Sequence, residues 1–206
     1  ANINMVQGII AGGVKALYQS IEGAEDCYED GVAIVENKKI SSKDSVIGIS
    51  ASGSAAFVMG ALKKSSDLGA YTALITFNEI KKENYIKDLL FTNVGPEIIT
   101  GSTRMKAGTA TKMMLNMIST TAMIKSNKIY KNYMVDLNVS NKKLKKRAIS
   151  IINDLTDLDY NKSEKLLQLA HNNVKVALVM NHLSIDYSQA LYELDKYKGN
   201  LRRILN

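Results

Sequence analysis

The sequence has no tryptophan, one proline, one cysteine and two histidines among its 206 residues. With Cys27 alone, the chain cannot form an intrachain disulfide, and such cysteine usage is typical of a reducing compartment, so we predict a cytoplasmic protein. His171 and His182 stand singly, which indicates no metal cluster, and we expect both at solvent-facing helix positions. No apolar run approaches the ~18 residues that cross a bilayer, so we predict a soluble protein without a membrane partner.

Positive charge exceeds negative charge, with 27 Lys and Arg against 20 Asp and Glu and a formal net charge of +7. A basic chain can bind nucleic acid, but the lysines are scattered except in 142–147, where no aromatic residues alternate with them to stack on bases. We therefore predict no nucleic-acid partner and interpret this cluster as the solvated face of a helix. The excess suits an anionic metabolite without indicating which one.

Short apolar runs alternate with helical patterns in the first part of the chain. Buried strands are predicted at residues 5–11, 44–51, 71–77 and 89–94, with helices at 14–21, from 55 and from about 102. Strands and helices in this order join by right-handed crossovers into a parallel sheet covered on both faces. The predicted fold class is therefore α/β, a three-layer sandwich.

The last part of the chain has a helical pattern throughout. Helices are predicted at about 142–154, at 163–171, and from 174 or 181 to 205 with a break at Gly199. Short helices in so few residues predict a small bundle, packed on the sheet domain or on a second subunit. We predict two domains, residues 1–150 and an all-helical domain of residues 151–206.

The start of the longest predicted helix combines a turn, hydroxyls and cations. The only proline ends the preceding apolar run, and Ser102 or Thr103 can cap the helix. The free amides of the first turn then lie near these hydroxyls and the cations Arg104 and Lys106, which predicts an anion-binding cradle. Methionines recur on one face of the helix, and we interpret this face as core-filling, with contact to a second subunit as the alternative.

Two other turns carry polar groups of interest. Ser50, Ser52 and Ser54 follow the strand predicted at 44–51 and precede a helix, a position where open α/β sheets bind ligands, although each serine could be only a helix cap. No nucleotide-binding P-loop motif accompanies them. Glu25 lies in the acidic turn 22–26, which by itself would indicate a solvated surface loop.

The amino-acid sequence of four stretches resembles that of the N-acetylmuramic acid 6-phosphate etherases and of the related glucokinase regulatory protein. Both are members of the sugar isomerase (SIS) superfamily. The most specific is Gly-Pro-Glu at 95–97 followed by Gly-Ser-Thr-Arg-Met-Lys-Ala-Gly-Thr at 101–109. The others are residues 5–13, 22–26 and 134–137. The resemblance runs to about Arg147 and only loosely beyond it, and it implies a SIS-type sandwich that works as a homodimer.

The resemblance implies a carbon–oxygen lyase that removes D-lactate from N-acetylmuramic acid 6-phosphate, a step in cell-wall sugar recycling, without a metal, nucleotide or redox cofactor. Matched motif to motif, Glu25 corresponds to the base that takes the proton from carbon 2. The candidate contacts to phosphate and sugar are Ser50, Ser52, Ser54, Glu97, Ser102, Thr103 and Arg104.

The chain departs from the etherase pattern in two places. Ser54-Ala55-Ala56 stands where etherases usually carry Arg-Thr-Pro, which is closer to the regulatory protein. The family's upstream phosphate loop and the residues that hold its catalytic acid are not in this sequence, so we expect a truncated, cleaved or separately encoded piece. A sugar-phosphate sensor without turnover is the rival hypothesis.

Overall fold

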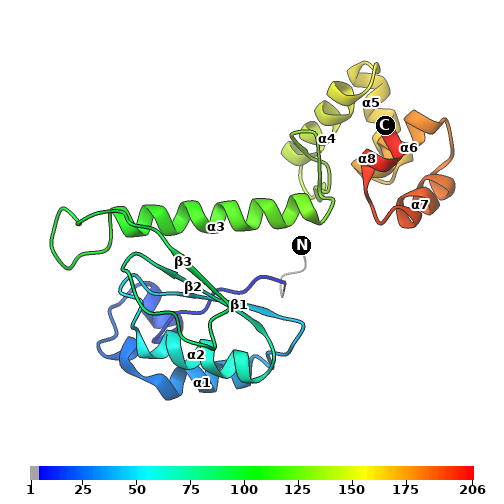
Figure 1. Cartoon of the computed structure of the whole chain (residues 1–206). Coiled ribbons are helices and arrows are strands. Elements are labelled where there is room, and N and C mark those ends of the chain that lie inside the picture. Colours follow the sequence, from blue (N-terminus) through cyan, green and yellow to red (C-terminus); the bar gives the residue numbers. More distant parts are fainter. Residues whose placement is uncertain (1–4) are drawn as a thin grey trace. The chain divides into compact units, whose positions relative to one another are not determined.

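The computed structural model describes residues 5–206 (Figure 1). Contacts divide the chain into two compact units, Ala1–Leu115 and Asn116–Asn206. The first unit holds a sheet with its helices, and the second holds a small hairpin and short helices. The division lies earlier than residue 150 because α4 (Lys142–Leu155) packs on the helices that follow it. The domain assignment itself stays a prediction.

The first unit is built on a parallel sheet of three strands in the order β1-β2-β3. The strands are β1 (Ser45–Ile49), β2 (Tyr71–Thr76) and β3 (Asp88–Phe91), and the register pairs Ile49 with Ile75 and Thr76 with Phe91. The central strand β2 is buried from Thr72 to Thr76, as expected for a strand with neighbours on both edges. The predicted parallel α/β fold is confirmed, with three of the four predicted strands present in the described chain.

Two helices, α1 (Tyr28–Asn37) and α2 (Ala56–Asp67), cover the same face of this sheet (Figure 1). They cross closely enough that a β-carbon on Gly31 would lie 2.0 Å from the Phe57 carbonyl oxygen. Likewise, a β-carbon on Gly60 would lie 2.2 Å from the Tyr28 carbonyl oxygen. The two backbones are therefore in direct contact. Leu62 of α2 packs with Leu74 of β2 and with Ile86 in a buried hydrophobic cluster.

The strand predicted at residues 5–11 is wrong, because this segment is irregular and largely exposed. The outer edge of β1 pairs with no strand in residues 5–206, and residues 5–11 form no ladder of hydrogen bonds with it. The helix predicted at 14–21 is replaced by a 3₁₀ turn, η1 (Gly13–Leu17). A second such turn, η2 (Ala24–Asp26), leads directly into α1.

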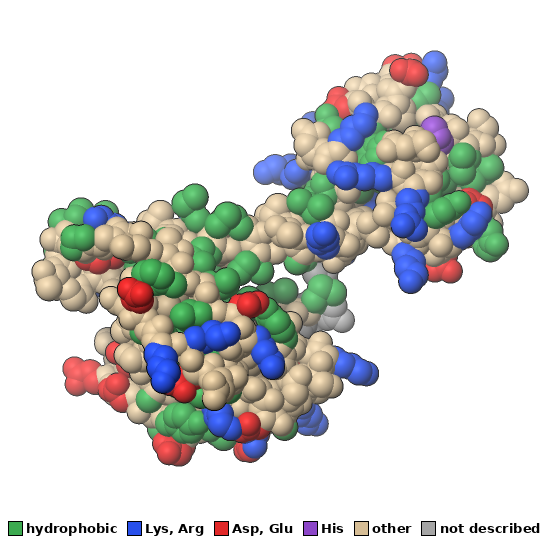
Figure 2. Space-filling model, in the orientation of Figure 1, with side chains coloured by type: hydrophobic (Ala, Val, Ile, Leu, Met, Phe, Trp, Pro, Cys, Tyr) green, Lys and Arg blue, Asp and Glu red, His purple; other side chains and the backbone are tan. Residues whose placement is uncertain are grey.

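The long helix is α3 (Lys106–Lys125), close to its predicted position. Our interpretation of its methionines as core residues is wrong for the described chain, since Met113 and Met117 are 55% and 59% exposed. Ala107 is the buried residue of this helix. Figure 2 shows hydrophobic side chains on the surface along α3. The apolar face of α3 is therefore open to solvent or to a partner.

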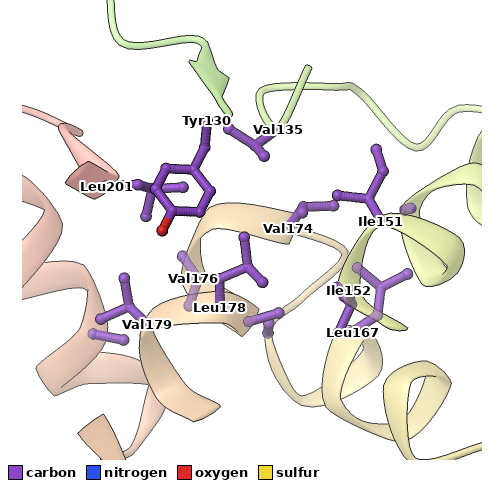
Figure 3. Packing of buried hydrophobic residues seen from close by; sticks show 14 of the residues in the cluster. Tyr130, Val135, Ile151, Ile152, Leu167, Val174, Val176, Leu178, Val179 and Leu201 are labelled. Atoms are coloured by element: carbon purple, nitrogen blue, oxygen red, sulfur yellow. The ribbon is translucent and has the colours of Figure 1, made fainter. Parts of the chain in front are cut away.

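The second unit begins with the last residues of α3, which are followed by the hairpin of β4 (Ile129–Tyr130) and β5 (Tyr133–Met134). Five helices follow: α4, α5 (Tyr160–Leu169), α6 (Val174–Leu183), α7 (Tyr187–Lys196) and α8 (Leu201–Leu205). Buried side chains of α6 contact those of the surrounding elements, among them Tyr130, Ile152 and Leu167 (Figure 3). The predicted helical bundle is confirmed, but the helices are shorter and more numerous because Asp159, Asn173 and Asp186 each cap a new one.

Candidate functional site

The turn between β1 and α2 is held together by its own serines. Ser50 is 5% exposed, and its Oγ accepts hydrogen bonds from the amides of Gly53 at 3.1 Å and Ala55 at 3.3 Å. The Oγ of Ser52 accepts from the amide of Ser54 at 3.2 Å and from its hydroxyl at 3.0 Å. Ser50 is thus committed to the turn, whereas Ser52 and Ser54 are exposed and present their hydroxyls at the start of α2.

Gly53 is required by the geometry of this turn. Its φ is +77°, and a β-carbon there would lie 2.8 Å from Oγ1 of Thr76 at the end of β2. The same Thr76 hydroxyl donates to the Ala51 carbonyl at 3.3 Å, and the side-chain amide of Asn78 donates to that carbonyl at 2.9 Å. The carboxyl ends of β1 and β2 therefore fix the position of the serine turn.

Glu25 reaches the same region from another part of the chain. It lies in η2, is exposed, and precedes α1 by three residues. Because η2 contacts α2 and the α1–α2 crossing is closed at Gly31 and Gly60, the Glu25 backbone is held near the first turn of α2. An acidic turn by itself indicates only a surface loop. The position of this turn beside α2 explains why Glu25 lines the cavity described below.

The loop before α3 is closed by Glu97. Both carboxylate oxygens of Glu97 accept from the amide of Lys106 at 3.1 Å, and one also accepts from the amide of Ala107 at 3.0 Å. Hydrogen bonds from Ala107 first and Lys106 second hold the pKa of Glu97 below its ordinary value. The expectation that Ser102 or Thr103 caps α3 is therefore wrong, because a glutamate nine residues upstream of the helix takes that place.

The cations of this loop do not form the predicted cradle. The ammonium of Lys106 donates to the Pro96 carbonyl at 2.6 Å, so it closes the loop instead of facing a ligand. Arg104 is exposed and does not line the cavity described below. An anion at this site would depend mainly on amides and hydroxyls.

One cavity of about 890 Å³ in the first unit joins several of the predicted residues. Its lining includes Glu25, the three serines Ser50, Ser52 and Ser54, and Thr103. The predicted residues Glu97, Ser102 and Arg104 are not part of the lining. The cavity also continues along β1 past Val46 and Ile47, which sequence reasoning did not assign to the site.

Charged groups in the cavity wall are mostly acidic. Asp26 and Asp44 join Glu25 there, and the cation in the described lining is Lys38, whose ammonium donates to the Gln7 side chain at 2.8 Å. Neither Lys38 nor Asp26 was predicted as a site residue, although Asp26 belongs to the stretch 22–26 that resembles the etherases. Within residues 5–206, no group of three or more His, Cys, Asp and Glu side chains could hold a metal ion.

A second cavity, of about 400 Å³, lies in the second unit between residues 135–139 and 171–173. Asp136 in its wall forms an ion pair with Lys128 and lies 4.0 Å from the ammonium of Lys175. Burial raises the pKa of Asp136, but the hydrogen bond from Lys128 and the nearby lysine charges outweigh it, so that this pKa lies below its ordinary value. Burial lowers the pKa of Lys175. Through its contact with Lys175, Asp136 links the segment after the hairpin to α6.

None of the helices in the described part of the chain is both long and apolar enough to span a membrane. His171 and His182 are both exposed, as predicted, but His182 alone of the two lies in a helix. His171 follows α5, with its ring centroid 4.4 Å from that of Tyr187. Neither histidine lies in the first cavity.

Comparison with known proteins relates both units to one family. Residues 1–66 match the model of the glucokinase regulatory protein N-terminal SIS domain, and residues 131–190 match that of the C-terminal lid domain of the same protein. The second match extends the resemblance past Arg147, where the motifs became loose.

Full-length relatives give the same assignment. An N-acetylmuramic acid 6-phosphate etherase of Bacillus cytotoxicus is 44% identical over 201 residues, which is 97% of this chain and 68% of the relative. The Bacillus subtilis enzyme of that name is 48% identical over 197 residues, 95% of this chain and 65% of the relative. The chain thus spans about two thirds of the length of these relatives. By this similarity, the chain belongs to the family of N-acetylmuramic acid 6-phosphate etherases.

Proposed function

We propose that this chain provides the sugar-phosphate site and the catalytic base of an N-acetylmuramic acid 6-phosphate etherase. The observation that carries the proposal is the single cavity lined by Glu25, by the serine turn and by Thr103. The two relatives described above bear the name of this activity, N-acetylmuramic acid 6-phosphate etherase. Hydroxyls and helix amides of the serine turn suit a phosphate, and a free carboxylate beside them suits proton abstraction.

The proposed reaction begins with the open-chain sugar, whose aldehyde at carbon 1 acidifies the proton on carbon 2. The Glu25 carboxylate takes this proton, the bond between carbon 3 and the lactyl oxygen breaks, and that oxygen leaves as protonated D-lactate. Water then adds to carbon 3 of the unsaturated aldehyde, which gives N-acetylglucosamine 6-phosphate. We assign no residue in this chain to the acid that protonates the leaving group, and the steps given to its residues need no metal or redox cofactor.

We assign a role to each candidate residue of the cavity from its exposure and from the hydrogen bonds that it makes. Ser52, Ser54 and the first amides of α2 bind the phosphate, and Ser50 holds the turn that presents them. Thr103, which also lines the cavity, contacts the sugar. Glu97 and Arg104, which we predicted as ligand contacts, lie outside the lining, and we propose a different role for Glu97 below.

Proton exchange tests the base without requiring the complete reaction. The chain is incubated with N-acetylglucosamine 6-phosphate in D₂O, and deuterium at carbon 2 is followed by proton NMR. We expect exchange by the wild type, a loss of about a hundred- to ten-thousand-fold in Glu25→Gln, and unchanged binding of the sugar phosphate by calorimetry. Glu22→Gln is the matched control, since Glu22 is an exposed carboxylate of the same turn and does not line the cavity.

The outcomes separate the alternatives. Exchange that survives in Glu25→Gln and is lost in Asp26→Asn would move the base to the neighbouring carboxylate of the cavity wall. Binding by the wild type without any exchange would support the rival function, a sugar-phosphate sensor. Absence of binding to any sugar 6-phosphate would refute the proposal as a whole.

We also propose a homodimer in the cytoplasm, with the exposed methionine face of α3 as its contact surface. Met113 and Met117 of α3 are 55% and 59% exposed, as is Met105 just before the helix at 60%, and exposed apolar surface marks interaction sites. Light scattering after size exclusion gives the mass in solution. A dimer that persists in the double variant Met113→Glu, Met117→Glu would place the contact elsewhere.

A further inference from the structure

The loop from Thr92 to Met105 joins β3 to α3 and carries Gly101 and Thr103 to the cavity wall. Apolar packing does not hold it there, since Ile98 and Ile99 are 77% and 69% exposed. Its φ of +84° at Gly101 and the bond from the Ser102 amide to the Ile99 carbonyl, 3.0 Å, shape its tip locally. The position of the tip therefore depends on how the two ends of the loop are joined.

The ends are joined by two sets of hydrogen bonds, each between a side chain of one end and the backbone of the other. The Glu97 carboxylate accepts from the amides of Lys106 and Ala107, and the Lys106 ammonium donates to the Pro96 carbonyl at 2.6 Å. We call these four residues, Pro96, Glu97, Lys106 and Ala107, the loop clasp. The clasp fixes residues 96–97 against the first turn of α3, so that the segment between them becomes a closed loop.

The carboxylate of the clasp occupies a place that anions favour. The first amides of a helix have no acceptor within the helix, and the helix dipole adds partial positive charge at this end. Glu97 supplies the negative charge from within the chain, and its pKa is lowered accordingly, by the amide of Ala107 first. A substrate phosphate could bind at the start of α3 only by displacing Glu97, which leaves the serine turn as the anion site of the cavity.

We propose that Glu97 and Lys106 are positioning residues, which hold Gly101 and Thr103 against the cavity and thereby set the affinity for the sugar phosphate without touching it. This inference rests on the proposed function for the identity of the ligand. The clasp itself is observable without any ligand, so that the two can fail separately.

Hydrogen exchange tests the clasp directly. In Glu97→Ala, we expect faster exchange of the amides of Lys106 and Ala107, which lose their acceptor, and of residues 98–105. Glu83→Ala is the matched control because Glu83 is an exposed glutamate outside the cavity and the clasp. Lys106→Met, which removes only the bond to the Pro96 carbonyl, should speed exchange over residues 98–105 alone. Exchange over 98–105 at the wild-type rate in both variants would overturn the proposal.

Binding and rescue test the consequence for the ligand. Calorimetry with N-acetylglucosamine 6-phosphate should show affinity about tenfold weaker or more in Glu97→Ala, the scale seen when a residue that orients a binding group is lost. Glu97→Gln keeps an acceptor oxygen and should retain most of the affinity. Acetate at about 100 mM should restore binding in Glu97→Ala and leave the wild type unchanged, because a free carboxylate can occupy the vacated amides.

The results distinguish this inference from the proposed function. If the wild type binds the sugar phosphate and Glu97→Ala binds it equally well, the positioning role is wrong while the site stands. Weaker binding that acetate does not restore, together with a lowered melting temperature, would reduce Glu97 to a stabilising cap and would also overturn the inference. If the wild type binds no sugar phosphate, the proposed function fails, and the exchange measurement alone decides on the clasp.

Discussion

Gly31 and Gly60 lie on the two sides of the α1–α2 crossing, and each meets the backbone of the other helix where a side chain would stand. A β-carbon on Gly60 would come within 2.2 Å of the Tyr28 carbonyl oxygen, far inside van der Waals contact. Backbone atoms cannot move aside as a flexible side chain can. The crossing is therefore fixed by the absence of two side chains, and it connects the helix after Glu25 to the helix after the serine turn.

Replacing either glycine should separate the two helices. We expect Gly60→Ala to lower the free energy of unfolding by about 1–3 kcal/mol, the range for overpacking. Urea unfolding followed by circular dichroism measures this free energy.

Gly108→Ala is the matched control. Gly108 also lies in a helix, but a β-carbon there would lie 3.6 Å from the nearest atom, an ordinary contact. Since alanine favours helix by about 1 kcal/mol over glycine, this variant should be neutral or more stable. Equal effects at both positions would contradict the close crossing.

Replacing Ser50 by alanine should lower stability, whereas replacing Ser54 by alanine should weaken ligand binding. Ser50→Ala leaves the amides of Gly53 and Ala55 without their acceptor in a buried position, and we expect a loss of about 1–2 kcal/mol in stability. Ser54 is exposed, so Ser54→Ala should change stability by no more than about 0.5 kcal/mol and weaken binding of the sugar phosphate. Urea unfolding and calorimetry on both variants decide the matter. A stability loss in Ser54→Ala as large as that in Ser50→Ala would show that the turn, and not a ligand, uses both hydroxyls.

The sequence predicted the sheet better than the parts around it. Each strand at β1, β2 and β3 is an apolar run bounded by turn residues, and the residues needed to recognise it are adjacent in the chain. The run at 5–11 has the same local pattern but finds no pairing partner in the described chain, and pairing is not encoded locally. Helix α1 was not predicted from the sequence, and Gly31 within it permits contact with α2, a relation that only the fold reveals.

The same distinction applies to the site. The serine turn follows a strand directly, so its place at the carboxyl end of β1 could be predicted. The capping of α3 by Glu97 could not, since a carboxylate nine residues upstream reaches the helix only when the intervening loop closes. Nearby Ser102 and Thr103 were the better candidates by local rules, and the loop fold excluded them.

The ion pairs of Asp136 should make the second unit sensitive to acid. The pKa of this carboxyl lies below its ordinary value of 3.8, so its contribution to stability is present above about pH 4 and is lost as the pH falls through the lower, folded-state pKa. We expect Asp136→Asn to be less stable than the wild type at neutral pH, and the difference to shrink below about pH 4. Urea unfolding at a series of pH values measures both. Asp157→Asn, at an exposed position, is the control, and a difference that grows on acidification would contradict the assignment.

Two buried serines offer a final test of the hydrogen bonding in the structure. Ser163 of α5 and Ser65 of α2 are both 0% exposed. The Oγ of Ser65 donates to the Ala61 carbonyl at 2.7 Å, whereas the Oγ of Ser163 has no hydrogen-bond partner among residues 5–206. A buried hydroxyl without a partner, as at Ser163, costs free energy, and alanine also has a higher helix propensity than serine. We therefore expect Ser163→Ala to raise the free energy of unfolding by up to about 1 kcal/mol. Ser65→Ala should raise this free energy by less, or lower it. Thermal and urea unfolding of both variants provide the comparison. A clear loss in Ser163→Ala would mean that its hydroxyl has a partner, such as a buried water, that stabilises the unit.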